Sequence, residues 1–175
     1  LKANGTVEKT IIGSIAESLT TDAGYDDHFE RLKEIFAKDS LQMVSFTITE
    51  KGYSLVNGKG EPLPGVEDDF ANGPKKAMSY MGKVAALLYA RYEAGAKPVA
   101  MVSMDNCSHN GDKLYAAINT FAEKWVANGV GDAGFVSYVN DKSKVSFPWS
   151  MIDKITPRPD ASVEEILKAD GIEEL

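Results

Sequence analysis

Hydrogen-bonding side chains are concentrated in one turn of this sequence, directly after the short apolar run at residues 98–102. An apolar run with turn residues on both sides is typical of a strand buried on both faces of a parallel sheet. Ligands of open α/β sheets bind outside the carboxyl ends of the strands, so this turn is the expected place for chemistry. It offers carboxylates, amides, hydroxyls and an imidazole, the side chain often used for proton transfer at neutral pH: Ser103, Asp105, Asn106, Ser108, His109, Asn110 and Asp112.

The same residue types also have a purely structural use in strand-to-helix turns. Asp, Asn and Ser accept hydrogen bonds from the free N–H groups of the next helix and tolerate unusual backbone angles. For any single residue of this turn, helix capping is therefore the more common explanation. Capping one helix requires one or two such side chains, however, and this turn offers several. Their density favours a functional site.

Three stretches of the sequence occur in an order known from one enzyme family. Residues 103–106 read Ser-Met-Asp-Asn and are followed by Asn110-Gly111, similar to the family pattern Ser-Cys-Asp-Asn and Asn-Gly. Residues 146–157 read Ser-Phe-Pro-Trp-Ser-Met-Ile-Asp-Lys-Ile-Thr-Pro, similar to Phe-Pro-Asn-x-Met-Val-Asp-Arg-Ile-Thr-Pro. Residues 47–53, Thr-Ile-Thr-Glu-Lys-Gly-Tyr, match Thr-x-Thr-Glu-Lys-Gly-Tyr. The chain thus resembles the long-chain mannitol dehydrogenase family, which includes the fructuronate and tagaturonate reductases.

The chain departs from the family pattern at several positions but keeps both Asn106 and Asp153. The departures are Met104 in place of Cys, Cys107-Ser108 in place of Leu-Pro, Trp149 and Ser150 in the Phe-Pro-Asn segment, and Lys154 in place of Arg.

The resemblance implies metal-free hydride transfer, dependent on NAD or NADP with NAD favoured, between a polyol or sugar-acid alcohol and the matching ketone. By position, Asn106 would donate a hydrogen bond to the substrate oxygen that becomes an alkoxide, and such donors stabilise charge that develops in the transition state. Asp153 would orient groups near the nicotinamide, although a helix N-cap or a partner for Lys154 is an equal alternative. Cofactor contacts are expected at Glu50, Ser103 and Asp105, with a solvated strand-end charge as the alternative for Glu50.

The resemblance also implies that parts of the enzyme lie outside this sequence. Members of the family carry a glycine-rich phosphate loop upstream, and a catalytic Lys followed by Asn and His in a mostly helical second domain. Residues 1–157 are therefore expected to be the later part of a Rossmann-like dinucleotide-binding domain. Residues 158–175 would form a linker and helix towards a missing helical C-terminal domain. A fragment of this kind would be inactive alone.

The elements that must position these residues follow from hydrophobic periodicity. Apolar residues at helical spacing, and alternation rich in β-branched residues, distinguish helices from strands. Helices are expected at residues 25–38, 74–94, 111–128 and 162–169, strands at 41–49 and 98–102 and from Thr10 towards Leu19, and a hairpin or surface excursion at 53–65. Strands that alternate with helices predict an α/β, Rossmann-like partial domain with a mostly parallel sheet and helices on both faces.

Gly129, Gly131 and Gly134 spell the dinucleotide fingerprint, but their context argues against that use. The fingerprint requires a strand before it and a helix after it. Here the preceding residues read as an amphipathic helix, so these glycines are interpreted as a helix end and a loop. Residues 134–140 have a strand-like composition, whereas the resemblance suggests a short helix, and both alternatives remain open.

Composition narrows the classes of function. The 175 residues suit about one domain, and a net charge of -7 makes nucleic acid an unexpected partner. One cysteine and two histidines predict neither a disulfide nor structural zinc, and no apolar run predicts a membrane span, so a cytoplasmic location is expected. Trp125 and Trp149 are expected in the core. The alternatives are a nucleotide-free binding module, or a hydrolase or transferase, although the sequence lacks a G-x-S-x-G nucleophile elbow.

Overall fold

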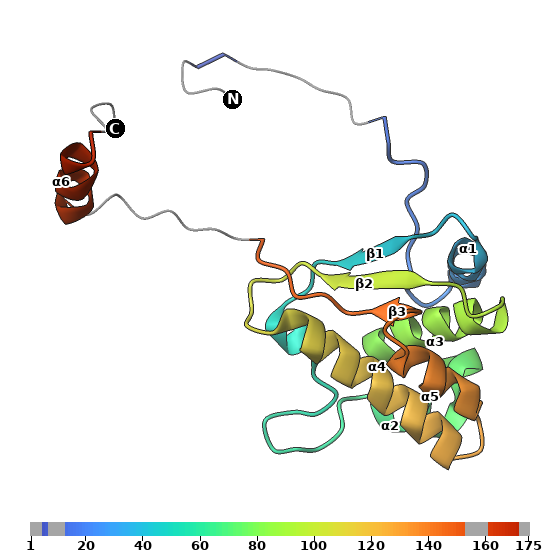
Figure 1. Ribbon diagram of the computed structural model, residues 1–175. Coiled ribbons are helices and arrows are strands. Elements are labelled where there is room, and N and C mark those ends of the chain that lie inside the picture. Colours follow the sequence, from blue (N-terminus) through green and yellow to red (C-terminus); the bar gives the residue numbers. More distant parts are fainter. Residues whose placement is uncertain (1–4, 7–12, 153–160, 172–175) are drawn as a thin grey trace.

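A parallel three-stranded sheet forms the centre of the protein, as Figure 1 shows. The computed structural model describes residues 5–6, 13–152 and 161–171. Strands β1 (Met43–Phe46), β2 (Val99–Ser103) and β3 (Val145–Ser146) pair in that order, and both pairs are parallel. Parallel strands must be joined by crossover connections, which helices provide here. The predicted Rossmann-like α/β class is confirmed.

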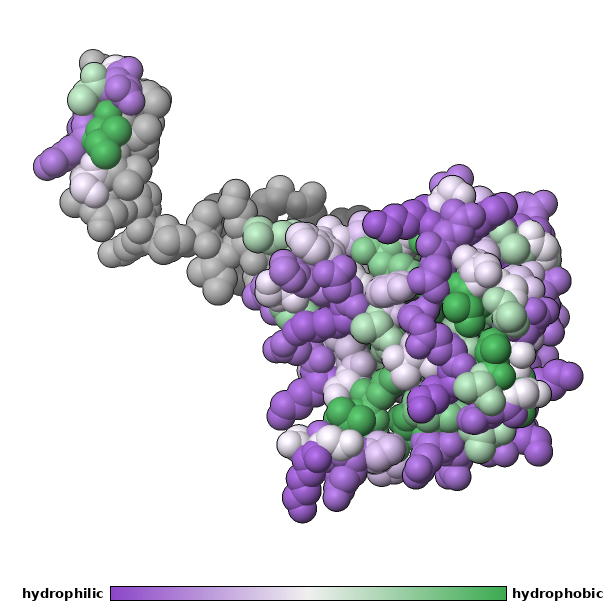
Figure 2. Space-filling model, turned by 60° about the horizontal axis from the view of Figure 1, so that its bottom comes forward, coloured by the Kyte–Doolittle hydropathy of each residue, from purple (hydrophilic) through white to green (hydrophobic). Residues whose placement is uncertain are grey.

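Helices α3, α4 and α5 lie together on one side of the sheet in Figure 1, and α1 packs against α3. The view of the helical side in Figure 2 is mostly hydrophilic, with small hydrophobic patches between charged side chains. Helices α4 and α5 each turn a set of buried apolar residues inward and a solvated face outward. The helices are α1 (Asp26–Ala37), α2 (Val66–Asn72), α3 (Tyr80–Glu93), α4 (Asn110–Ala127), α5 (Ala133–Asn140) and α6 (Ala161–Ala169), with 3-10 turns η1 (Glu50–Tyr53) and η2 (Pro74–Lys76).

The hydrophobic core lies between the sheet and these helices. Successive strand residues point to opposite faces, so Val99 and Met101 of β2 enter the core with Phe46 of β1. Trp125 of α4 is fully buried in the same cluster, as predicted. On the other face of the sheet, Met43 is exposed.

The helix predicted for residues 74–94 begins later than expected. Pro74 starts only the short turn η2, and α3 starts after Ser79. The buried carboxylate of Asp69 interrupts the helix because it accepts the backbone N–H groups of Met78 and Ser79 at 2.7 and 2.8 Å. Ser79 is the N-cap of α3, and its hydroxyl accepts a hydrogen bond from the backbone N–H of Gly82. A long-range carboxylate therefore sets the start of this helix.

Most other predicted elements are present with changed bounds. Helices α1 and α4 and strand β2 begin and end within one residue of the predicted bounds, whereas β1 is shorter than the strand expected at 41–49. The excursion at 53–65 contains one antiparallel bridge between Val56 and Pro62. The strand expected from Thr10 falls partly outside the described residues, and residues 13–19 contain no strand.

The open question about residues 134–140 is answered, and the interpretation of the glycines as helix-end and loop residues is correct for Gly129 but wrong for Gly134, which lies in helix α5. Residues 134–140 form part of helix α5, whose N-cap Asp132 accepts from the N–H of Gly134 at 2.7 Å. Gly129 follows the end of α4 with a positive φ of 69°. The interpretation of Gly129 as a helix-end residue is confirmed, because a helix and not a strand precedes it.

The amino ends of β1 and β2 are held by the guanidinium group of Arg91, which is fully buried. Arg91 extends from α3, and its five N–H groups donate to five backbone carbonyl oxygens at 2.6 to 3.0 Å. Two of the carbonyls belong to the end of α1, where unpaired carbonyls favour a cation. The acceptors are those of Phe36, Lys38, Leu41, Lys97 and Pro98.

We expect Arg91→Lys to lower the free energy of unfolding by about 3 kcal/mol, because an ammonium group has three donors and leaves buried carbonyls unpaired. Urea unfolding followed by circular dichroism measures the change. The matched control is Arg31→Lys on the exposed face of α1, where Arg31 pairs with Glu17 and Glu34. Equal effects of the two substitutions would show that Arg91 does not hold the strand ends.

Candidate active site at the carboxyl edge of the sheet

The segments that follow all three strands meet at one edge of the sheet, because parallel strands end on the same side (Figure 1). They are η1 after β1, the turn at residues 104–109 after β2, and residues 147–152 after β3. Asp153, a predicted catalytic residue, lies outside the described residues. The predicted site residues that the structure describes all belong to this edge: Glu50, Ser103, Asp105 and Asn106.

A hydrogen-bonded network centred on Tyr53 links β1 and β2 at this edge. The Tyr53 hydroxyl lies 2.5 Å from the Ser103 hydroxyl and donates to the Asp105 carboxylate. The same carboxylate oxygen accepts the backbone N–H of Ile48 at 3.0 Å. Because Ser103 is fully buried, its hydroxyl serves this network and is not exposed to solvent. Ser103 and Asp105 thereby lock the turn that carries Asn106.

Tyr53 was not singled out in the sequence, although it ends the motif at residues 47–53. Burial raises the pKa of Tyr53 well above its usual range, and the hydrogen bond to the Asp105 carboxylate adds to this effect. The phenol therefore remains a neutral donor at physiological pH. A buried Tyr near the end of a strand needs a partner for its hydroxyl, which is the signal that sequence reasoning could have used.

Asn106 lies in the exposed part of the same turn, as a residue that meets a substrate would. Its backbone is constrained, since the preceding carbonyl, that of Asp105, accepts the N–H of Cys107 at 2.9 Å. The same carbonyl accepts the side-chain amide of Asn110 at 3.0 Å. The turn thus combines an exposed side chain with a held backbone, which suits an oriented hydrogen-bond donor.

Glu50 is placed at the start of η1 and pairs with Lys113 of α4. The hydrogen bond from Lys113 lowers the pKa of Glu50, and the same bond raises the pKa of Lys113. Both groups are therefore charged at neutral pH. The Glu50 side chain is 66% exposed, so the structure is compatible both with a solvated strand-end charge and with a charge beside a bound cofactor.

The sequence prediction that Trp149 belongs to the core is wrong, because its side chain is 62% exposed. Trp149 follows β3, and its indole stacks on the His109 ring with the centroids 4.2 Å apart. Its Nε1–H donates to the Asp112 carboxylate at 2.9 Å. The two partners come from the start of α4, so the indole is held by a ring and a carboxylate at the surface, where its polar N–H can be paired.

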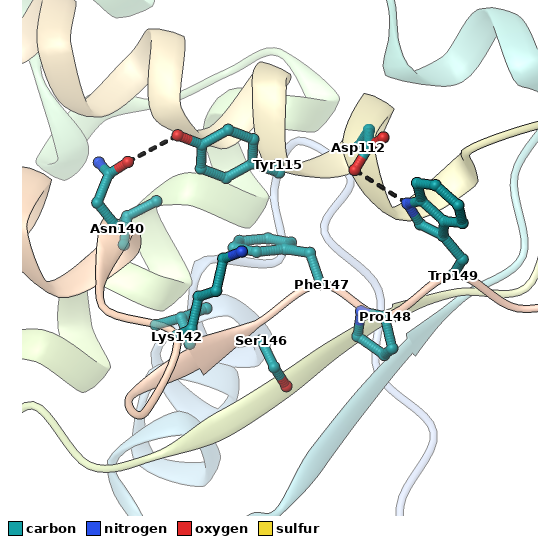
Figure 3. Close-up of a pocket in the computed structure, with 10 residues that line it drawn as sticks. Asp112, Tyr115, Asn140, Lys142, Ser146, Phe147, Pro148 and Trp149 are labelled. Atoms are coloured by element: carbon teal, nitrogen blue, oxygen red, sulfur yellow. Dashed lines mark hydrogen bonds between the residues drawn. The ribbon is translucent and has the colours of Figure 1, made fainter.

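A cavity of about 790 Å³ opens next to this stack, between β3 and helices α4 and α5 (Figure 3). Tyr115, Phe147 and Pro148 form apolar walls, and Lys142 extends along them. The Tyr115 hydroxyl donates to the Asn140 side chain at 2.6 Å across one end. Of the residues that the structure describes, Glu50, Ser103, Asp105 and Asn106 do not line this cavity, so it lies beside them.

The residues that the structure describes contain neither a candidate metal site nor a membrane-spanning helix. Within those residues, no group of three or more His, Cys, Asp and Glu side chains could hold a metal ion. The helices of the same part are all too short or too polar to cross a bilayer.

A parallel α/β sheet with polar loops gathered at its carboxyl edge defines a Rossmann-type domain. The sequence model described as the mannitol dehydrogenase Rossmann domain matches residues 4–173. The chain therefore belongs to the mannitol dehydrogenase family, as the three motifs predicted.

Relatives and solved structures agree with this assignment. The chain is 47% identical over 173 residues to the D-mannonate oxidoreductase of Thermotoga maritima, covering 99% of this chain and 32% of that protein. It is 34% identical to the D-arabinitol 4-dehydrogenase of Ralstonia nicotianae, covering 79% of this chain and 28% of that protein. The Pseudomonas fluorescens mannitol 2-dehydrogenase in ternary complex with NAD and D-mannitol matches with a TM-score of 0.57 and 30% identity, covering 83% of this chain and 28% of that one. The chain thus spans about a third of the length of these proteins.

We expect Tyr53→Phe to lower the free energy of unfolding by about 2 kcal/mol, since the buried Ser103 hydroxyl loses its hydrogen-bond partner and the Asp105 carboxylate loses a donor. Tyr115→Phe is the matched control, because its hydroxyl bonds an exposed side chain of Asn140. Urea unfolding of both variants measures the difference. A loss no greater for Tyr53→Phe than for Tyr115→Phe would contradict a central role for the Tyr53 network.

Proposed function

We propose that this chain is the later part of the dinucleotide-binding domain of an NAD(P)-dependent oxidoreductase. The reaction is hydride transfer between a secondary alcohol of a polyol or sugar acid and the matching ketone. The observation that carries the proposal is Asn106, an exposed amide on a held turn at the carboxyl edge of a mannitol dehydrogenase family domain. A mostly helical second domain, with the catalytic Lys of the family, would complete the enzyme.

A sugar acid is the favoured substrate class. The relative at 47% identity is a D-mannonate oxidoreductase, whereas the polyol dehydrogenases among the relatives are 31 to 34% identical. Against this, another D-mannonate oxidoreductase, that of Escherichia coli, is only 29% identical. Substrate identity therefore has to be decided with a panel containing both classes.

The described residues fit one half of a dinucleotide site. The carboxyl edge of a parallel sheet is where such cofactors bind, and Glu50 and Asp105 stand there with side chains at least partly exposed. Among residues 13–152, the glycines of the literal fingerprint follow helix α4, so they do not form the strand-to-helix phosphate loop. We therefore assign the nicotinamide side to Glu50 and Asp105. Ser103 supports them from its buried position.

The bound cofactor supplies the acceptor for the hydride, with NAD favoured because the similar mannitol 2-dehydrogenase structure holds NAD. The contribution of this chain is orientation and charge stabilisation. The Asn106 amide would donate to the reacting oxygen, where negative charge develops as the alcohol is oxidised. Asp153 would orient neighbouring groups, a role supported by the Asp at this position of the family pattern.

We expect the protein encoded by the whole gene to oxidise a hexitol or D-mannonate with NAD or NADP, and to reduce fructose, fructuronate or tagaturonate. Asn106→Ala should lower kcat by about a hundredfold, as the loss of one oxyanion donor does. The 175-residue chain alone should show no turnover. Absorbance at the nicotinamide band measures turnover by the whole protein, by its Asn106→Ala variant and by the 175-residue chain.

Asn119→Ala is the matched control for this substitution, because Asn119 lies on the exposed surface of α4 and bonds Glu123 and Asn140. It should leave kcat unchanged. Equal kcat values for wild type and Asn106→Ala would refute the role of Asn106. A folded wild-type protein without turnover on any of these substrates would refute the proposed function itself.

A further inference from the structure

We propose that Asn110 and Ser150 are positioning residues that hold the Asn106 amide in its working orientation. This inference rests on the proposed function, because it takes Asn106 as the group that contacts substrate. It goes further in assigning a role to two side chains that contact no substrate. Asn110 begins α4, and Ser150 follows β3, so the pair joins two segments separated by 40 residues.

The side-chain amide of Asn110 is completely buried and uses both of its ends. Its Nδ2 lies 3.0 Å from the Asp105 carbonyl oxygen and 3.3 Å from that of Ser103. The same nitrogen lies 2.9 Å from the Ser150 hydroxyl and 3.0 Å from the Ser150 carbonyl. Its Oδ1 accepts the N–H groups of Gly111 at 2.9 Å and Ser150 at 3.1 Å. These contacts engage all the donors and acceptors of one amide.

Two of the carbonyls that receive these bonds, those of Ser103 and Asp105, belong to the turn just before Asn106. A peptide unit is planar, so holding the Asp105 carbonyl also sets the direction of the Asn106 N–H and Cα. The Ser150 hydroxyl donates to the Ser103 carbonyl and so holds the peptide unit before Met104 in the same way. Rotation of the turn would break bonds to both Asn110 and Ser150.

The segment after β3 is pressed against α4 closely enough to keep these bonds in place. A Cβ atom added at Gly111 would lie only 2.4 Å from the Phe147 carbonyl oxygen and 2.7 Å from that of Pro148. Only a residue without a side chain allows this approach. The two residues of the Asn-Gly motif therefore act together. Asn110 forms the hydrogen bonds, and the missing side chain of Gly111 leaves the space in which Ser150 reaches Asn110.

Such a clamp matters for catalysis because a hydrogen-bond donor that is misplaced by about an ångström can cost on the order of a hundredfold in rate. The β1 side of the turn is held independently by Tyr53 and Ile48 through the Asp105 carboxylate. Loss of the Ser150 hydroxyl would therefore shift the turn without releasing it. The expected result is a folded enzyme whose hydride step is slower.

The test uses Ser150→Ala in the protein encoded by the whole gene. We expect kcat to fall about tenfold, a partial loss of alignment, with little change in KM for the cofactor. The primary deuterium isotope effect on kcat, measured with substrate labelled at the reacting carbon, should rise, because hydride transfer becomes more rate-limiting. Ser150→Thr keeps the hydroxyl and should restore most of kcat. If Ser150 contributed to stability alone, Ser150→Ala would leave the isotope effect unchanged, and there would be no loss of kcat for Ser150→Thr to restore.

Ser143→Ala is the matched control, because its hydroxyl bonds only the exposed Asp141 carboxylate among the described contacts. If Ser150→Ala fails to fold, Ser150→Cys keeps the side-chain volume with weaker hydrogen bonds and serves as the test. A folded Ser150 variant with the kcat and isotope effect of wild type would overturn the inference while leaving the proposed function intact. Absence of turnover in the wild type would overturn both.

Discussion

The buried guanidinium of Arg91 is the constraint on which the sheet depends. A charge in an apolar interior is unfavourable unless its hydrogen-bonding groups are paired, and here five carbonyl oxygens pair it. Those oxygens come from the end of α1 and from the entries to β1 and β2, up to 55 residues away from Arg91 in sequence. The two strands therefore start side by side. Their parallel register carries this alignment to the opposite edge, where Phe46 lies beside Ser103.

The two edges of the sheet use different sets of hydrogen bonds. At the amino edge, one side chain donates to many backbone carbonyls. At the carboxyl edge, the side chains of Asp105 and Asn110 also accept backbone N–H groups, those of Ile48, Gly111 and Ser150. Because the amino edge already aligns the strands, the carboxyl edge can hold a short turn by its backbone while leaving the Asn106 side chain exposed. An oriented hydrogen-bond donor requires this arrangement, in which a held backbone carries an exposed side chain.

Elements whose signals are local could be predicted from the sequence, while those determined by distant contacts could not. The apolar periodicity of α1 and α4 and the apolar run of β2 are local, and these elements occur as predicted. The start of α3 depends on Asp69, nine to ten residues upstream of the N–H groups that it accepts. Pro74 is a common first residue of helices, but this carboxylate outweighs it.

The candidate site shows the same division. Asn106, Glu50 and Asp105 could be located because parallel strands bring their carboxyl ends together. The roles of Tyr53, Asn110 and Ser150 could not, because each depends on a partner more than 35 residues away or on a buried carbonyl. Tyr53 and Asn110 lie inside motifs of the family, whereas Ser150 stands where the chain departs from the family pattern. The structure gives a physical reason for these residues: their side chains form hydrogen bonds between the segments that follow the three strands.

Trp149 illustrates how one departure from the family pattern changes the chemistry that the turn can perform. An indole in place of the usual Asn covers the His109 ring, whose backbone is in the left-handed region with φ of 53°. Stacking restricts the orientation of this imidazole, and the Asp112 carboxylate accepts the indole N–H of the same Trp149. In the described part of the chain, this edge of the sheet is therefore built to hold side chains in fixed positions.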